Sequence, residues 1–464
     1  MTKRIALGVF ETINPTNGMP TWNHPNGRAD TWDDPRFWTS LAVKLEDAGF
    51  DFLFFADTYG YPTIDGQVPD ETIAHSIQFP ALDPMLLISA LAAATERLGF
   101  VVTSPTTVEK PYATARRFAS LDHFTSGRIG WNIVTGSSQA TTDALFGIAD
   151  SGTHDSRYDV ADEFVDVCLQ LWEGGWEDGA EVRDRDRDVY ADPAKLHRID
   201  HAGPHFPVSG QFVVPPSEQR TPVLFQAGTS DRGRAFAARN AESVFIQGQT
   251  IARAAEHVAD IRAKAVAHGR AADAVKVVTG MTVVVAPTHD EAVARRAELE
   301  EMYAMADAAV MFAGFTGVDL RDVDLDMPLT DIRSDQGQTL IDRFVRPGAP
   351  VPSVGEVLDG FRRKANRGFQ ITGSSDEVAD EIQAIVEGSD VDGIMLEPTF
   401  GDLGAYEDFI SLVLPILRER GIAGDGPIGA TLREHLHPAG TARLPQDHPG
   451  ARFRIPADEM ERIA

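Results

Sequence analysis

The sequence has almost no cysteine, because Cys168 is the single one among 464 residues. An internal disulfide and a cysteine-rich metal site are therefore both excluded. Cys168 lies in an apolar stretch with helical spacing, residues 164–172, which predicts a buried structural thiol rather than a nucleophile.

Long apolar runs and positive charge are also scarce. No apolar run reaches the roughly 18 residues that a membrane-spanning helix needs, and the N-terminal residues contain no leader-like segment. We therefore expect a cytoplasmic protein without a membrane partner. The 42 basic residues are outnumbered by 70 acidic ones, and the resulting net charge of −28 disfavours nucleic acid as a partner.

The sequence also lacks a Gly-x-Gly-x-x-Gly motif after any strand-like run, which argues against a dinucleotide-binding sheet. Strand-like and helix-like runs instead alternate along the whole chain. This alternation predicts an α/β protein built as a (β/α)8 barrel. The eight expected strands are Arg4–Phe10, Phe50–Ala56, Gly99–Thr103, Arg128–Val134, Pro222–Gly228, Glu242–Gln247, Val275–Ala286 and Gly393–Glu397.

Two long irregular stretches interrupt the alternation, near 173–219 and 310–354. We expect both as insertions on the barrel rim, since such excursions usually cap a pocket or build an interface. Residues 1–424 would then form the barrel domain. The proline-rich residues 425–464 are expected to be an extended tail that packs on a neighbouring subunit or along the barrel, and a disordered tail is the alternative.

Four sequence segments carry a family resemblance. They resemble segments that occur in the same order in the flavin-dependent monooxygenases of the nitrilotriacetate monooxygenase type, a branch of the bacterial luciferase-like superfamily. Four segments in the right order are hard to obtain by chance, so the signal is specific. The segments are ARRFASLDHFTSGRIGWNIVT (115–135), HDSRYDVADEF (154–164), ADPAKLHRIDHAGPHFPVSG (191–210) and PVLFQAGTSDRGR (222–234).

The resemblance implies a luciferase-like TIM barrel that acts as a two-component monooxygenase. A separate NAD(P)H:flavin reductase would supply reduced FMN by diffusion, and reduced FMN with O2 would oxygenate a small organic substrate. Family substrates include aminopolycarboxylates, sulfones, alkanes and riboflavin, and aromatic residues near the expected pocket favour an aromatic or heteroaromatic compound. The resemblance also implies a homo-oligomer, a dimer or a tetramer. The alternatives are a deazaflavin-dependent oxidoreductase on the same barrel and a flavin-binding protein without turnover.

Three polar residues at predicted strand ends are candidates for holding the flavin ring. Asp57 follows a buried apolar strand, where a carboxylate needs a partner or a ligand. The resemblance places Asp57 beside the ring, and a helix cap or a salt bridge is the alternative. Thr103 and Asn132 lie near the ends of the next two strands, and their uncharged donors and acceptors suit the polar edge of an isoalloxazine. Their alternative role is to satisfy backbone groups of the barrel.

Four further residues are candidates for the phosphate side of the cofactor. His154 and Tyr158 are one helical turn apart and can share a face. The resemblance places this pair near the phosphate or ribityl chain, and ordinary packing is the alternative. Thr229 and Ser230 follow Gly228 between a strand and a helix, where hydroxyls and free amides make a phosphate cradle. Ser230 can also cap that helix, and the two roles are compatible.

The substrate pocket has weaker candidates. Phe10 and Phe55 lie at or near strand ends, where aromatic rings could wall a pocket, and His24 lies with Trp22 in a turn-rich loop. No residue is identified as catalytic.

A metal site is not expected. His197, His201 and His205 are spaced four apart, which is the spacing of ligands on one face of a helix. Gly203 and Pro204 lie among them, however, and predict a loop instead.

Overall fold

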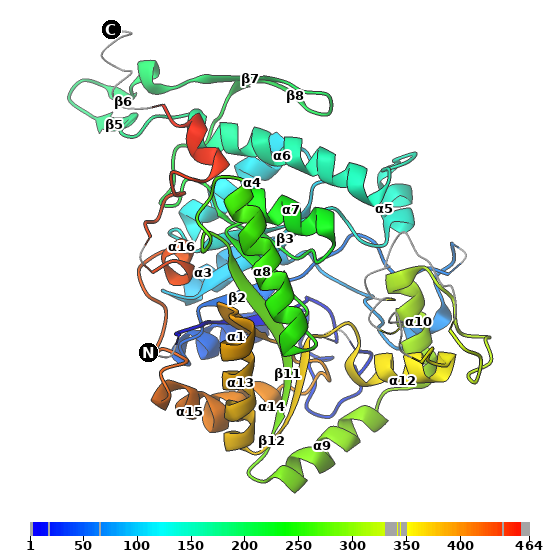
Figure 1. The fold of residues 1–464 in the computed structure, drawn as a ribbon. Coiled ribbons are helices and arrows are strands. Elements are labelled where there is room, and N and C mark those ends of the chain that lie inside the picture. The colour runs from blue at the N-terminus through cyan, green and yellow to red at the C-terminus, as the bar shows by residue number, and fades with distance from the viewer. Residues whose placement is uncertain are drawn as a thin grey trace.

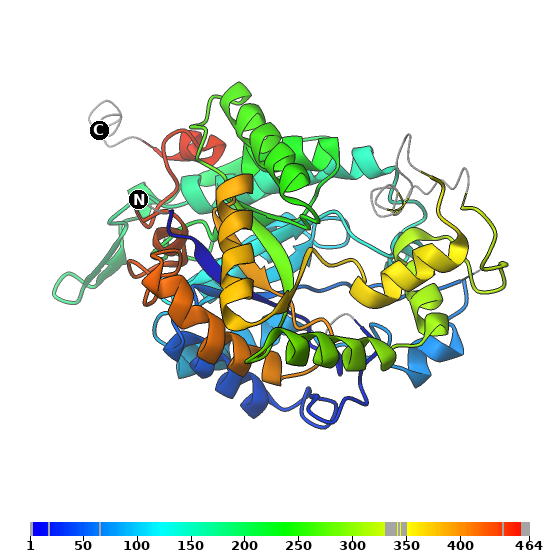
Figure 2. The same cartoon turned by 60° about the horizontal axis from the view of Figure 1, so that its bottom comes forward.

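The computed structural model describes residues 3–16, 19–64, 66–329, 341, 344, 350–438 and 440–455. Within these ranges eight parallel strands close into a barrel, and helices cover its outside (Figures 1 and 2). Pairing of the first strand with the last closes the ring and confirms the predicted (β/α)8 fold. In spatial order the strands are β1 (Ala6–Glu11), β2 (Phe52–Phe55), β3 (Gly99–Pro105), β4 (Ile129–Val134), β9 (Val223–Gln226), β10 (Ser243–Ile246), β11 (Lys276–Val285) and β13 (Gly393–Leu396).

An additional strand, β12 (Phe369–Gly373), lengthens one side of the barrel at its carboxyl end. The first part of the long strand β11, up to Thr279, pairs with β10. From Met281 onward the same edge of β11 pairs with β12. The chain that enters β12 is therefore brought to the mouth of the barrel, where the strands end.

The helices mostly return the chain from one strand to the next, as a parallel barrel requires. Among the described residues, no helix is both long and apolar enough to span a membrane. The stretch predicted as irregular from Val310 begins inside helix α10. The helices are α1 (Pro35–Asp47), α2 (Asp70–Ala74), α3 (Ile88–Ala94), α4 (Pro111–Phe124), α5 (Gln139–Phe146), α6 (His154–Gly174), α7 (Asp231–Asn240), α8 (Ile251–Ala267), α9 (His289–Glu301), α10 (Met305–Thr316), α12 (Val354–Lys364), α13 (Ser375–Ser389), α14 (Gly404–Asp408), α15 (Leu414–Glu419) and α16 (Leu432–Leu436).

The two excursions leave the barrel at opposite ends. Helix α6 runs antiparallel to the strands, so the excursion after Gly174 starts at the amino end. It forms two hairpins, β5 (Glu181–Asp184) with β6 (Val189–Ala191), and β7 (Arg198–Ala202) with β8 (Pro207–Gln211). The second excursion lies between β11 and β12, where α10 and α12 are seen on the right of Figure 1. Part of this second stretch, within 330–349, lies outside the described residues.

The two faces of each strand divide the core into a lumen and an outer layer. Alternate residues of a strand point to opposite faces, so Phe52 and Phe54 face the lumen while Phe55 faces the helices. The ring of Phe55 lies 5.7 Å from that of Trp38 in α1. The prediction that Phe55 walls a pocket inside the barrel is therefore wrong.

Large apolar side chains fill the lumen, and glycines make room for them. A Cβ atom on Gly8 would lie 2.4 Å from the ring of Phe52, so only glycine fits that position. The lumen cluster consists of Phe52, Phe54, Val101, Val223, Phe225, Phe245, Val278, Met395, Leu432 and Leu436.

The C-terminal segment closes the amino end of the lumen. Leu432 of α16 lies so close to Gly99 that a Cβ there would be 2.5 Å from the leucine methyl. The next residue, Arg433, forms a 2.6 Å ion pair with Glu242, and the two side chains are 2% and 1% exposed. Proximity to Arg433 lowers the pKa of Glu242 to about 2, against the opposing effect of burial. This part of the expected tail therefore belongs to the barrel core.

Replacing Arg433 by methionine should lower the free energy of unfolding by about 3–5 kcal/mol, because Glu242 would keep a buried charge without its partner. Urea unfolding measures this loss. The matched control is Arg452→Met, which removes an ion pair between Asp166 and an arginine that is 54% exposed and should cost less than about 1 kcal/mol. Equal losses in the two variants would contradict the role given to Arg433.

Candidate functional site

Thr103 and Asn132 lie side by side at the mouth of the lumen, as their positions in the sequence predicted. They are partners in the β3–β4 register, and the Asn132 amide donates a 2.8 Å hydrogen bond to the Thr103 hydroxyl. That hydroxyl in turn donates to the carbonyl of Phe55 at 2.9 Å. The other amide atom, Asn132 Oδ1, is buried and has no hydrogen-bond partner among the described residues. It is therefore an acceptor in place for the N–H group of a ligand.

Asp57 lies just beyond the end of β2 and carries a perturbed carboxyl group. Burial raises the pKa of Asp57 to about 7, against a backbone hydrogen bond from Thr58, and the charge of Asp83 raises it further. The Thr58 N–H donates to the carboxylate at 2.8 Å. Near neutral pH this group can therefore either hold or release a proton.

A second group of polar side chains gathers at the start of α7. His154 Nε2 lies 3.5 Å from Ser230 Oγ, and the His154 and Tyr158 rings are 5.3 Å apart. Gln226, at the end of β9, donates to the Tyr158 hydroxyl at 3.2 Å. Burial raises the pKa of Tyr158, so the phenol keeps its proton as a donor. The predicted residues on α6 and α7 thus converge on one place.

The turn between β9 and α7 is narrow and needs glycine. A Cβ atom on Gly228 would lie 2.3 Å from the Gln226 amide nitrogen and 2.8 Å from the Tyr158 hydroxyl. Ser230 accepts a 3.0 Å hydrogen bond from the Gly233 N–H and so caps α7. Thr229, just before it, accepts through its carbonyl from Arg234. Ser230 therefore has the predicted cap role, and its hydroxyl also lies beside His154 and Tyr158.

The other proposed pocket residues are dispersed. Phe10 is half-buried at the top of the lumen, where its ring stacks on Phe54 with centroids 5.6 Å apart. His24 lines a surface groove of about 410 Å3 together with Arg295 and Leu299 of α9. Trp22, in the same loop, is 43% exposed. Of these candidates, only Phe10 lies at the mouth of the lumen.

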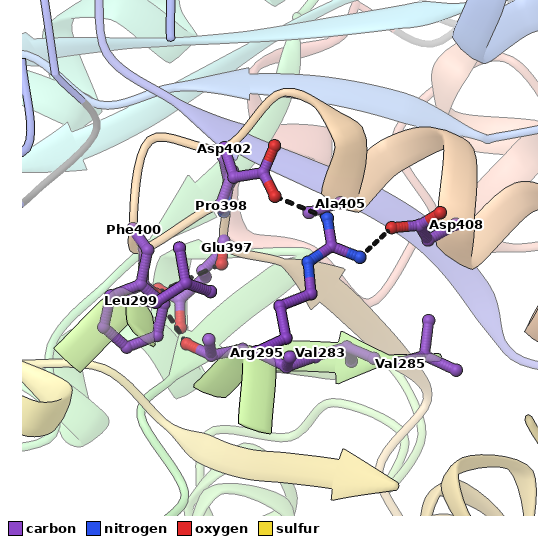
Figure 3. A pocket seen from close by; sticks show the side chains of 13 residues that line it. Val283, Val285, Arg295, Leu299, Glu397, Pro398, Phe400, Asp402, Ala405 and Asp408 are labelled. Atoms are coloured by element: carbon purple, nitrogen blue, oxygen red, sulfur yellow. Dashed lines mark hydrogen bonds and ion pairs between the residues drawn. The ribbon is translucent and has the colours of Figure 1, made fainter. Parts of the chain in front are cut away.

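A small cavity of about 20 Å3 lies between β11, α9 and the loop after β13 (Figure 3). Arg295 crosses it and bonds to Asp402 at 2.5 Å and to Asp408, and Glu397 also lines it. The volume suits about one water molecule, so a flavin cannot bind there. The cavity shares Arg295, Leu299 and Asp402 with the groove that contains His24.

Two of the three histidines that are spaced four apart contact separate carboxylates. His201 lies near Glu163 at 3.2 Å, and His197 lies near Glu177 at 2.7 Å. Within the described ranges, no group of three or more histidine, cysteine or carboxylate side chains could hold a metal ion.

Sequence reasoning missed four polar residues at the mouth. Gln226 is the last residue of β9, Glu397 directly follows β13, and Gln247 directly follows β10. A polar residue that ends an apolar strand is the signal that identified Asp57, so it could have found these three as well. Arg367 precedes β12 after an irregular turn, and no pattern in the sequence points to it.

Comparisons with known proteins relate the whole chain to one family. Residues 16–392 match the family described as luciferase-like monooxygenase. The chain is 39% identical to a long-chain alkane monooxygenase of Geobacillus thermodenitrificans, covering 98% of this chain and 99% of the relative. It is 38% identical to a dimethyl-sulfide monooxygenase of Hyphomicrobium sulfonivorans, covering 98% and 94%. A riboflavin lyase solved with modified FMN and riboflavin superposes with a TM-score of 0.93 at 43% identity, covering 98% of this chain and all of the other.

Replacing Asp57 by asparagine should stabilise the flavin-free protein at pH 8. The folded pKa of about 7 lies above the ordinary value of 3.8, so the wild type loses stability as the pH rises between these values. The variant should be more stable by about 1–4 kcal/mol at pH 8 and no more stable near pH 4. Urea unfolding at both pH values measures the difference. The exposed Asp186→Asn serves as control, and a benefit independent of pH would contradict the assignment.

Proposed function

The chain belongs to the luciferase-like monooxygenase family and is a flavin-dependent monooxygenase, and we propose that it uses reduced FMN from a separate reductase. The observation that carries this proposal is the presence of two polar groups, of different chemistry, at the carboxyl end of the barrel. Thr103 and Asn132 offer donors and acceptors at the lumen, and His154, Tyr158 and Ser230 converge at a helix start. A flat ring joined to a single phosphate matches both groups.

The residues present fit FMN at both ends. The unsatisfied acceptor Asn132 Oδ1 would take a ring N–H, with Thr103 bonded to the same amide, and Asp57 is proposed for the ring side as well. The narrow turn at Gly228 would let the phosphate approach the backbone, with Thr229 and Ser230 as donors.

His154 and Tyr158 would complete the phosphate side, His154 through Nε2 and Tyr158 through its protonated phenol. When bound, reduced FMN supplies the reaction with O2. The protein orients the ring, excludes water and, at Asp57, holds or moves a proton near neutral pH.

The electrons would come from a NAD(P)H:flavin reductase through diffusing FMN, since the sequence has no dinucleotide fingerprint of its own. A cytoplasmic location and a homo-oligomeric state are part of the same proposal. The substrate proposed is an aromatic or heteroaromatic compound, such as a sulfone or riboflavin. Its support is the aromatic ring of Phe10 at the mouth of the lumen, stacked on Phe54, and the similarity to a riboflavin lyase.

The two-component proposal predicts that the purified protein alone does not oxidise NADH. Adding FMN, a flavin reductase and O2 should give oxygenated products from some members of an aromatic panel, with label from 18O2 incorporated. Mass spectrometry of the products is the readout. Fast NADH consumption without the reductase would contradict the division into two components, and FMN binding without any product would favour a binding protein.

Replacing Ser230 by alanine should weaken FMN binding on the order of tenfold, because a hydroxyl donor to the charged phosphate is lost. Riboflavin at the cofactor site has no phosphate, so its affinity should change little. Fluorescence titration of both flavins measures this. Ser353→Ala, which removes the cap of α12 far from the site, is the matched control. Equal losses for FMN and riboflavin would make Ser230 only a helix cap.

A further inference from the structure

A further polar cluster lies at the mouth of the lumen. It is distinct from the Thr103–Asn132 pair and from the group at the start of α7. It consists of Glu397, Arg367 and Gln247, which come from the ends of β13 and β10 and the start of β12. Arg367 donates to Glu397 Oε1 at 3.0 Å, and the Gln247 amide donates to the same oxygen at 2.7 Å. The Gly368 N–H reaches the other carboxylate oxygen at 3.3 Å.

This cluster is placed where charge is costly. The Glu397 side chain is fully buried and that of Arg367 is 7% exposed, and the lumen below them is apolar. An ion pair in such a place usually stabilises a fold no better than apolar residues of similar size. Stability therefore does not account for it, whereas the carboxyl end of a barrel is where ligands are bound.

The cluster joins an aromatic stack and has a defined hydrogen-bonding pattern. The Arg367 guanidinium lies 4.6 Å from the ring centre of Phe10, which itself stacks on Phe54. The bond to Glu397 orients the Gln247 amide, and its acceptor Oε1 is buried without a hydrogen-bond partner among the described residues. A Cβ on Gly280 would lie 2.6 Å from Glu397 and 2.8 Å from Gln247, so a glycine makes room for the cluster.

We propose that Arg367, Glu397 and Gln247 recognise the polar edge of a planar ring in which a carbonyl acceptor stands beside an N–H donor, as in a lactam or imide. The guanidinium would donate to the carbonyl and continue the aromatic stack, and Gln247 Oε1 would accept from the N–H. An alkyl chain or a dialkyl sulfide offers neither group and would leave Gln247 Oε1 without a donor. This inference rests on the proposed function in one respect. The ring that is recognised is either the substrate or the pyrimidine edge of FMN.

The test uses the double variant Arg367→Met/Glu397→Gln, which removes both charges together and leaves no buried ion alone. Flavin-free protein is titrated with FMN, and FMN-saturated protein is titrated with lumichrome, a planar ring with this edge but no ribityl phosphate. Loss of lumichrome affinity on the order of tenfold or more, with FMN affinity retained, assigns the cluster to the substrate. A similar loss for FMN assigns it to the cofactor edge.

Arg128→Met is the matched control, because Arg128 is also buried and lies over a phenylalanine ring, but in the outer layer. It should leave both affinities unchanged. Gln247→Met should reproduce the loss without touching any charge. The proposal is overturned if the double variant has the same affinity as the wild type for both FMN and lumichrome. It is also overturned if FMN affinity is unchanged and neither protein binds lumichrome. Neither titration needs a reductase or turnover, so this result is independent of the oxygenase proposal.

Discussion

Filling the lumen is the constraint on which the rest of the structure depends. Eight strands enclose a space that side chains must occupy, and here phenylalanine rings from alternate strand positions do most of it. Glycines at Gly8, Gly99 and Gly130 leave the volume that these rings and Leu432 require. The packing is dense in the middle and at the amino end, so polar side chains and ligands have room only where the strands end.

The positions of buried charge follow from this packing. At the amino end, Arg433 and Glu242 face each other among backbone carbonyls, and Arg433 also donates to the carbonyl of Thr221 at 2.9 Å. In the wall, Glu11 bonds to both Arg28 and Tyr406 and so ties the loop after β1 to the barrel. These two groups are saturated by protein partners. The unsatisfied acceptors on Asn132 and Gln247, by contrast, both lie at the carboxyl end of the barrel.

The fold and about half of the site could be predicted from the sequence. Alternating apolar runs locate all eight strands, and Thr103, Asn132, Tyr158 and Ser230 are brought to the carboxyl end as expected. The prediction for Phe55 was wrong because the stretch FLFF is apolar at every position. Such a stretch does not show which of its residues face the lumen and which face the helices. Arg367 and the closing role of Leu432 depend on contacts between distant segments, which no local pattern records.

The closure of the lumen by residues 432–436 also has a consequence for synthesis. All eight strands precede this segment in the chain, yet the amino end of their shared lumen lacks its last apolar side chains until the segment arrives. A ribosome-bound chain that already contains every strand therefore exposes the phenylalanine-lined interior to water. The barrel therefore reaches its final packing only after the C-terminal segment has left the exit tunnel.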